Sequence, residues 1–284
     1  MLRWIHLAPL LVFLGLAGPP ATAARGPHST EATASPMSHV RQLAGRIGPR
    51  PAGTAGERRA VRYVRRTFES LGYSVSVEEF RLPQGGRSSN VVARRPSTPA
   101  ETPLLVGGHL DTVRGSPGGN DNASGVAVLL SLAGALAPED ADDITFVAFG
   151  AEEFQPGTGE HHIGSAAHVR GMTDAQRDDL RAMISADMIG KVRRPIVARL
   201  TGTDRGASRL LAEAVRDAGM RPSVRTLGDI SDHGPFARAG LPAAFLWTGD
   251  EPNHHQPTDV VANVSPRALR RGLRILQALL DLIP

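Results

Sequence analysis

Short apolar runs alternate with helical patterns through most of the chain after residue 100, and this alternation limits the possible folds. The predicted strands cover 104–107, 144–149, 183–187 and 243–247, and the predicted helices cover 124–136, 165–170, 204–218 and a last helix with Ser265 as N-cap and Pro266 in its first turn. Strands joined through helices pair in parallel, and the helices then cover both faces of the sheet. We therefore predict an α/β fold, with a single globular domain and a central, mostly parallel, twisted β-sheet sandwiched by helices.

The chain before residue 100 adds a helix and two strands to this pattern. Apolar residues recur at helical spacing from Thr54 to Leu71, and Gly72 follows as a stop signal. Apolar and polar residues alternate over 73–82, and 90–94 is a second short apolar segment, so both are predicted strands.

The N-terminus has the features of an export signal. Arg3 precedes an apolar run over 4–16, and a small-residue cleavage site ends at Ala23. This run is shorter than the roughly 20 residues of a spanning helix. We predict a secreted, extracellular protein with no membrane span after cleavage, and an uncleaved anchor is the alternative. The expected parts are a signal peptide (1–23), a flexible leader (24–37) and a folded domain (38–284).

Composition excludes several classes of site and partner. Cysteine is absent, so disulfides, a lipid-anchoring cysteine and a thiolate zinc site are excluded. The formal net charge is +4 and the sequence pI is about 10.4. Aromatic residues make up 4% of the chain, which is too few for the stacking platforms of single-strand nucleic-acid binders. We predict a monomer with no nucleic-acid partner.

Acidic and imidazole side chains follow several of the predicted strands. They are His109, Asp111, Asp121, Glu152, Glu153, Asp187 and His255. The carboxyl ends of parallel strands meet at one edge of an α/β sheet, where such sheets bind ligands. Isolated acids beside buried strands are costly unless they are paired or bound to a cation. We therefore predict that these side chains share one cavity.

His109 and Asp111 lie on the same side of an extended segment in the sequence His-Leu-Asp. The imidazole can bind a metal through one ring nitrogen while Asp111 accepts a hydrogen bond from the other. A buried histidine satisfied within the core is the alternative. Asp121 lies in a loop rich in Gly and Asn that opens a helix, where a carboxylate can bridge two cations or simply cap the helix.

Glu152 and Glu153 are adjacent acids directly after a buried strand, and they would repel each other without a cation. One can bind metal and the other can hold an attacking water; a solvated surface pair is the alternative. Asp187 lies within an apolar run and is either a ligand or a buried acid satisfied by backbone donors. His255 lies in a loop, and His254 is an equally plausible donor by composition alone.

These residues together indicate a metal centre. Two histidines and several carboxylates suit a dication such as Zn²⁺ with nitrogen and oxygen ligands. Paired metal sites of this kind typically activate water for hydrolysis. The residues alone therefore favour a metal-dependent hydrolase with two cations.

The sequence resembles the two-zinc aminopeptidases of metallopeptidase family 28 over about residues 38–283. The motifs that carry the resemblance are RPAGTAGERRAVRYVRRTFESLGY, GGHLDTV, GGNDNASGVAVLL, FVAFGAEEF, ISADMIG, SDHGPF and HHQPTD, in the family's order. The resemblance implies a zinc-exopeptidase-like fold, two Zn²⁺, peptide substrates with a free N-terminus and a cis peptide bond after Asp121. It also implies roles for each residue: His109 and Asp187 on one zinc, Glu153 and His255 on the other, Asp121 between them, Glu152 as general base, and Asp111 orienting His109.

Two features depart from the family's pattern. His254 stands where some members have a tyrosine that helps to stabilise the oxyanion, and residues 155–162 are less regular than the family's short glycine-rich link, so this segment is expected to line the substrate cleft. A carboxypeptidase or a glutaminyl cyclase on the same fold is the alternative enzyme. A degenerate binding module is the alternative outside enzymes. Metallopeptidase family 20 is disfavoured, because the gaps around Asp187 hold no inserted domain.

Overall fold

A computed structural model describes residues 35–97, 102–137, 143–153, 155, 157–202 and 206–283. The predicted signal peptide (1–23) and most of the predicted leader (24–37) lie outside these residues. The last two residues of the predicted leader belong to helix α1 (Pro36–Val40), where Met37 is buried. Helix α1 therefore begins two residues before the predicted start of the folded domain at residue 38. Among the described residues, no helix is long and apolar enough to cross a membrane.

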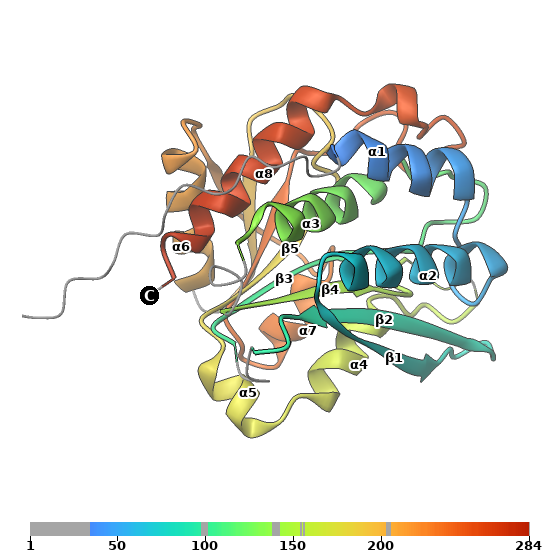
Figure 1. Cartoon of the computed structure of the whole chain (residues 1–284), viewed down its shortest axis with the longest axis horizontal. Helices are drawn as coiled ribbons and strands as arrows, with labels where there is room; N and C mark the ends of the chain where they lie inside the picture. The colour runs from blue at the N-terminus through green and yellow to red at the C-terminus, as the bar shows by residue number, and fades with distance from the viewer. Residues whose placement is uncertain are drawn as a thin grey trace, which may run out of the picture.

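Eight strands form one mixed sheet in the order β1-β2-β4-β3-β5-β8-β6-β7 (Figure 1). They are β1 (Ser74–Arg81), β2 (Arg87–Arg94), β3 (Leu104–His109), β4 (Ile144–Phe149), β5 (Ala182–Ala186), β6 (Ile196–Leu200), β7 (Ser223–Leu227) and β8 (Ala243–Trp247). The central strands β4, β3, β5 and β8 are parallel, β1 and β2 attach antiparallel on one side, and β6 attaches antiparallel to β8 on the other. The predicted α/β sheet is confirmed, with its parallel part at the centre.

The central strands are apolar on both faces. In β3, Leu104 and Val106 belong to the core on one side of the sheet, and Leu105 belongs to the core on the other. In β4, Phe146 and Phe149 divide in the same way. Strands with this composition require helices on both faces, because neither face can be left in water.

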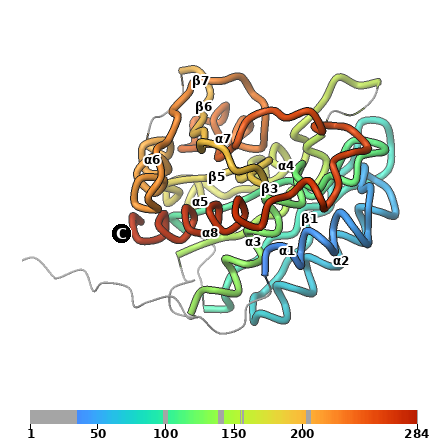
Figure 2. The backbone as a smooth tube through the Cα atoms, turned by 90° about the horizontal axis from the view of Figure 1, so that it is seen from above, coloured from blue at the N-terminus to red at the C-terminus, as the bar shows by residue number. Residues whose placement is uncertain are grey.

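Helices cover both faces (Figures 1 and 2). One face carries α1, η1 (Arg41–Ile47), α2 (Ala55–Ser70), α3 (Ala123–Ala135), α6 (Gly206–Asp217) and α8 (Pro266–Leu280), and the other carries α4 (Ile163–Gly171), α5 (Asp174–Asp179) and α7 (His233–Arg238). A short turn, η3 (Val261–Asn263), precedes α8. Helix α3 contacts both α1 and α8.

The predicted helix starts agree with the caps in the structure. The Thr54 side chain accepts a hydrogen bond from the Glu57 backbone N–H at 3.4 Å, and Ser265 accepts one from the Ala268 N–H at 3.4 Å, with Pro266 in the first turn of α8. These side chains satisfy backbone donors that have no partner within the helix.

Several elements were not predicted. Strand β7 is mostly exposed and carries Arg225 and Thr226 at its centre, so its sequence has the character of a loop. Helix α7 begins His-Gly-Pro, a start that local propensity disfavours, yet the helix forms because Phe236 and Ala237 are buried against the sheet. Strand β6 and helices α1 and α5 were also not predicted.

Candidate metal centre

The seven predicted site residues come from the carboxyl ends of the central strands and from adjoining loops. His109 ends β3, Glu152 and Glu153 follow β4, and Asp187 directly follows β5. Asp121 precedes α3, and the loop after β8 supplies His255. The parallel strands bring these ends to one edge of the sheet, as predicted.

One group of donor atoms surrounds the His109 ring. Its Nε2 lies 3.0 Å from Asp121 Oδ1 and 3.3 Å from Asp187 Oδ1. The His109 side chain is 1% exposed, and both acids are buried. These three residues form one candidate cation site.

A second group surrounds His255, whose Nε2 lies 3.3 Å from Asp121 Oδ2 and 3.0 Å from Glu153 Oε2. Asp121 thus presents one carboxylate oxygen to each histidine. His254 lies beside this group, with its Nε2 3.5 Å from Asp121 Oδ2. A donor atom of His254 lies within 4.8 Å of those of Asp121 and His255, so these three residues form a further candidate group.

Asp111 differs from the expected arrangement. Its Oδ1 lies 3.7 Å from His109 Nδ1, which is too long for a hydrogen bond, and that ring nitrogen is buried without a partner among the described residues. The carboxylate instead accepts the backbone N–H groups of Glu152, at 3.0 Å, and Glu153, at 3.2 Å. Asp111 therefore ties the end of β3 to the turn that carries both glutamates.

The crowded carboxylates shift the pKa values of the group. Burial raises the pKa of Glu153 well above its usual range, and the carboxylate of Asp121 adds to this rise. Burial likewise raises the pKa of Asp187. Burial alone would lower the pKa of His109, but the charges of Glu152 and Asp187 outweigh it and raise the pKa well above 6.5. Hydrogen bonds to Asp121 and Glu153 raise the pKa of His255 to about 10.

These residues fit divalent cations such as zinc. Three groups have donor atoms within 4.8 Å of one another: His109 with Asp121 and Asp187, His109 with Glu152 and Glu153, and Asp121 with His254 and His255. All of these atoms are nitrogen or carboxylate oxygen, which zinc accepts. Glu153 Oε1 and Asp187 Oδ1 are buried and accept no hydrogen bond within the described part of the chain. Four buried carboxylates, those of Asp121, Glu152, Glu153 and Asp187, converge here, and a bound cation would compensate their charge.

Sequence reasoning missed several residues that hold the centre in place. Asp259 accepts the backbone N–H groups of Asn120, at 2.8 Å, and Asp121, at 2.9 Å. The buried Arg50 donates to the carbonyls of Leu110, at 2.8 Å, and Pro117, at 2.6 Å. Both lie within the quoted motifs, but their partners are distant in the sequence and no spacing rule identifies them.

A cavity of about 380 Å³ opens beside the centre. Its lining includes Asp121, Glu152, Glu153, Asp187 and His255, together with His161, His162, Met188, Asp229, Ile230, Phe245, Trp247, Asp250 and His254. His161 and His162 belong to the segment 155–162, which was expected to line the cleft. The Asp121–Asn122 peptide bond is cis, as the resemblance implied.

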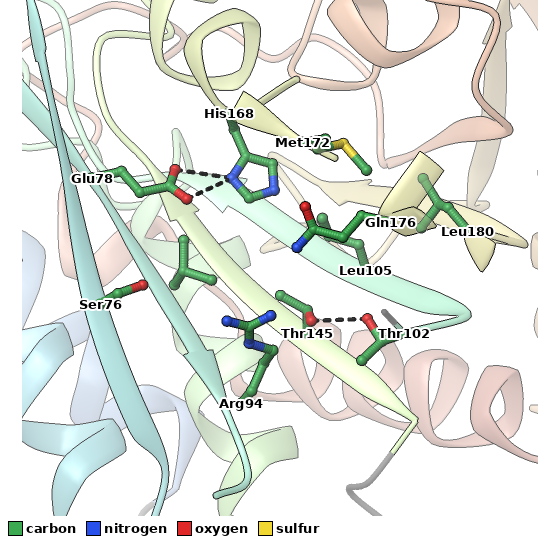
Figure 3. Close-up of a pocket in the computed structure, with 11 residues that line it drawn as sticks. Ser76, Glu78, Arg94, Thr102, Leu105, Thr145, His168, Met172, Gln176 and Leu180 are labelled. Atoms are coloured by element: carbon green, nitrogen blue, oxygen red, sulfur yellow. Dashed lines mark hydrogen bonds and ion pairs between the residues drawn. The ribbon is translucent and has the colours of Figure 1, made fainter. Parts of the chain in front are cut away.

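A smaller pocket, of about 60 Å³, lies elsewhere on the sheet between β1, β2 and the α4–α5 region (Figure 3). His168 Nδ1 lies 2.9 and 3.1 Å from the two Glu78 oxygens there, and the hydroxyls of Thr102 and Thr145 pair at 2.8 Å. Its described lining contains none of the seven predicted site residues, so this pocket is separate from the candidate metal centre.

The fold and this cluster define an α/β protein with a candidate cation site at the carboxyl edge of its sheet. The profile of Peptidase family M28 matches residues 90–280, and the chain belongs to that family.

Individual relatives agree with this membership. The chain is 28% identical over 242 residues to leupeptin-inactivating enzyme 1 of Streptomyces exfoliatus, covering 82% of this chain and 53% of that protein. It thus spans about half the length of this curated relative.

Two solved structures share the fold. The structure of BSAP, a zinc aminopeptidase from Bacillus subtilis, gives a TM-score of 0.75 at 19% identity and covers 86% of this chain and 93% of that chain. An Acidobacteriales bacterium glutaminyl cyclase gives a TM-score of 0.74 at 18% identity and covers 92% of this chain and 99% of that chain.

Proposed function

We propose that this chain is a zinc aminopeptidase that removes N-terminal amino acids from peptides. His109 and Asp187 would hold one Zn²⁺, Glu153 and His255 would hold a second, and Asp121 would bridge them. The family membership supports peptidase chemistry, and the zinc aminopeptidase of Bacillus subtilis shares the fold.

The observation that carries the proposal is the position of the Asp121 carboxylate. Its Oδ1 lies 3.0 Å from His109 Nε2, and its Oδ2 lies 3.3 Å from His255 Nε2. A carboxylate between two histidines, each with a further acid of its own, supports a pair of cations sharing one ligand.

Zinc ions bound here would polarise the scissile carbonyl and acidify the attacking water. Glu152 takes a proton from that water and passes it to the leaving amine, as a general base and then a general acid. Asp111 keeps Glu152 in place through the backbone hydrogen bond.

The charge of the cavity favours a substrate with a free N-terminus. Asp121, Glu152, Glu153 and Asp187 lie at its base, and Asp229 and Asp250 line it as well. The carboxylates of Asp229 and Asp250, which are not proposed zinc ligands, would attract an α-ammonium group and repel a C-terminal carboxylate. This argues for cleavage at the N-terminal end and against a carboxypeptidase.

We also propose that the protein is exported and acts as a secreted monomer, with residues 1–23 removed as a signal peptide. Its N-terminal sequence supports this, since a charged residue, an apolar run and small residues follow in order. N-terminal sequencing of the protein recovered from culture medium tests the cleavage site.

A substrate panel tests the proposed activity. Purified, zinc-supplemented protein is incubated with aminoacyl-p-nitroanilides, with their N-acetylated forms, with N-blocked peptides that have a free C-terminus and with a peptide that begins with glutamine. We expect the free-amine anilides to be cleaved and the acetylated forms to be inert.

The panel also separates the alternatives. Release of the C-terminal residue from the blocked peptides would indicate a carboxypeptidase. Ring closure at the glutamine without peptide cleavage would indicate a cyclase like the fold neighbour from the Acidobacteriales bacterium. If the zinc-bound protein turned over none of these substrates, the result would favour a binding module.

A further inference from the structure

Glu152 has a second buried partner outside the predicted metal centre. His162 Nε2 lies 3.1 Å from Glu152 Oε1, and the His162 side chain is 3% exposed. The other oxygen, Glu152 Oε2, faces the centre, 4.0 Å from His109 Nε2. The two oxygens of this carboxylate are therefore divided between an imidazole on one side and the reaction centre on the other.

The backbone fixes His162 at this position. Its N–H donates to the Glu152 carbonyl at 2.8 Å, and the Ile163 N–H donates to the Ala151 carbonyl at 2.9 Å. His162 precedes α4 with φ of 55°, a left-handed conformation that is uncommon for a residue with a side chain. These two hydrogen bonds join the ends of the segment 153–162 and place His162 next to Glu152.

The far side of the ring is also held. His162 Nδ1 lies 3.1 Å from Asp229 Oδ1 and 3.0 Å from His161 Nδ1. Asp229 in turn pairs with Arg238 of α7. The ring is therefore held between Glu152 on one side and His161 and Asp229 on the other, which restricts its rotation away from Glu152.

We propose that His162 is a positioning residue for Glu152: its Nε2–H donates to Oε1 and so holds Oε2 toward the attacking water. This rests on the proposed role of Glu152 as the base. A free glutamate side chain has several rotamers, and only some direct an oxygen to the reacting atoms. Restricting it to one of these raises the rate of the proton transfer without changing how tightly the peptide binds.

The test replaces His162 and measures kcat and KM separately, with zinc content and thermal stability as further readouts. We expect His162→Leu to lower kcat by roughly 10- to 100-fold, with KM within about threefold of wild type and unchanged zinc per chain. His162→Gln keeps an N–H donor and should recover most of the lost kcat. Glu160→Gln, in the same segment but with an exposed side chain, is the matched control and should behave as wild type.

Three results would overturn the positioning role: an unchanged kcat in His162→Leu, a rise in KM in place of the fall in kcat, or equal rates for the Leu and Gln variants. Should the Leu variant not fold, His162→Asn takes its place under the same criteria, since its shorter amide does not reach Oε1.

A double variant separates this inference from the proposed function. If the effect acts through Glu152, Glu152→Gln/His162→Leu is no slower than Glu152→Gln alone. Activity retained by Glu152→Gln would refute the base assignment itself. An inactive Glu152→Gln together with a fully active His162→Leu would refute only the inference about His162.

Discussion

Two adjacent glutamates experience opposite electrostatic environments. Burial raises the pKa of Glu153, and the Asp121 carboxylate raises it further. Burial acts in the same direction on Glu152, but the neighbouring His109 and His162 outweigh it and lower the pKa. Glu152 therefore remains a carboxylate that can accept a proton, whereas Glu153 requires a compensating cation. The proposed division of roles between base and ligand rests on the contacts of each side chain, since Glu152 faces His162 and Glu153 faces His255.

Replacement of Glu152 tests this division. Glu152→Gln keeps the shape of the side chain and removes the base, so we expect kcat to fall by roughly 10²–10⁴-fold. Zinc per chain should stay near the wild-type value, because the proposed ligands are untouched. Glu153→Gln should instead reduce zinc binding. A Glu152→Gln enzyme with near-normal turnover would show that another group accepts the proton.

Glu57 gives the chain a pH-dependent stability. Burial, with a contribution from Asp111, raises the pKa of Glu57 from 4.5 to about 8. Between pH 4.5 and about pH 8, the Glu57 carboxyl is protonated in the folded protein but ionised in the unfolded chain. The stability that Glu57 contributes is therefore full below pH 4.5 and is lost as pH rises to about 8.

The variant Glu57→Gln should remove this dependence. The Gly53 N–H donates to Glu57 at 2.6 Å, and Ser88 donates to it at 2.5 Å, so a neutral amide keeps an acceptor in place. We expect the variant to gain about 4 kcal/mol relative to wild type between pH 5 and pH 9, measured by urea unfolding at both values. Exposed Glu79→Gln is the control. Parallel pH curves for wild type and Glu57→Gln would contradict the shift.

At this scale, the sequence predicts a functional residue when the residue follows its own strand, and it fails when the residue's partners are far away in the sequence. Acids after buried strands, such as Asp187, are conspicuous because the strand fixes where the side chain emerges. Asp259 is not, because its partners Asn120 and Asp121 are more than 130 positions away. The Asp111 carboxylate was expected on His109, but it binds two backbone N–H groups, which no side-chain pattern reveals.

At the scale of elements, Asn122 joins the start of α3 to the end of β5. Its side-chain amide donates to the Ala186 carbonyl at 2.9 Å and accepts the Gly125 N–H at 2.8 Å. Asp121 and Asp187 are the neighbours of these two residues in sequence. The hydrogen bond between Asn122 and Ala186 therefore helps to set the distance between two proposed ligands.

A methyl group at Gly125 should disturb this junction. A Cβ there would lie 2.1 Å from the Ala186 carbonyl oxygen, which is backbone and yields little. We expect Gly125→Ala to destabilise the fold by roughly 2 kcal/mol and to weaken zinc binding, since α3 must shift. Gly171→Ala, with nothing within 4 Å of the added carbon, is the control for thermal unfolding and zinc titration. Equal behaviour of the two variants would show that the junction does not position the ligands.

The elements that could be predicted are those with a strong apolar pattern. β4 and α8 are fully or periodically apolar, and the sequence places both within a few residues. The sheet edge around β7 could not be predicted, because its short, exposed strand derives its order from pairing with β6. Tertiary contacts decide such segments, and they leave no local signature.

At the scale of the whole molecule, the candidate metal centre depends on contacts between segments that are far apart in the sequence. The segment after β8 supplies His255, and its Asp259 then holds the loop of Asp121. Opening of this segment would separate one set of proposed ligands from the other. Cation binding and folding should therefore be linked, so that bound zinc raises the melting temperature and a chelator lowers it.

Zinc titration of the chelated protein, with turnover of an aminoacyl-p-nitroanilide followed in the same samples, tests the two-cation proposal most directly. We expect no activity in the metal-free protein, activity that rises with zinc until about two ions are bound per chain, and a higher melting temperature at that point. An active metal-free protein, or a folded chain that takes up no zinc, would contradict it.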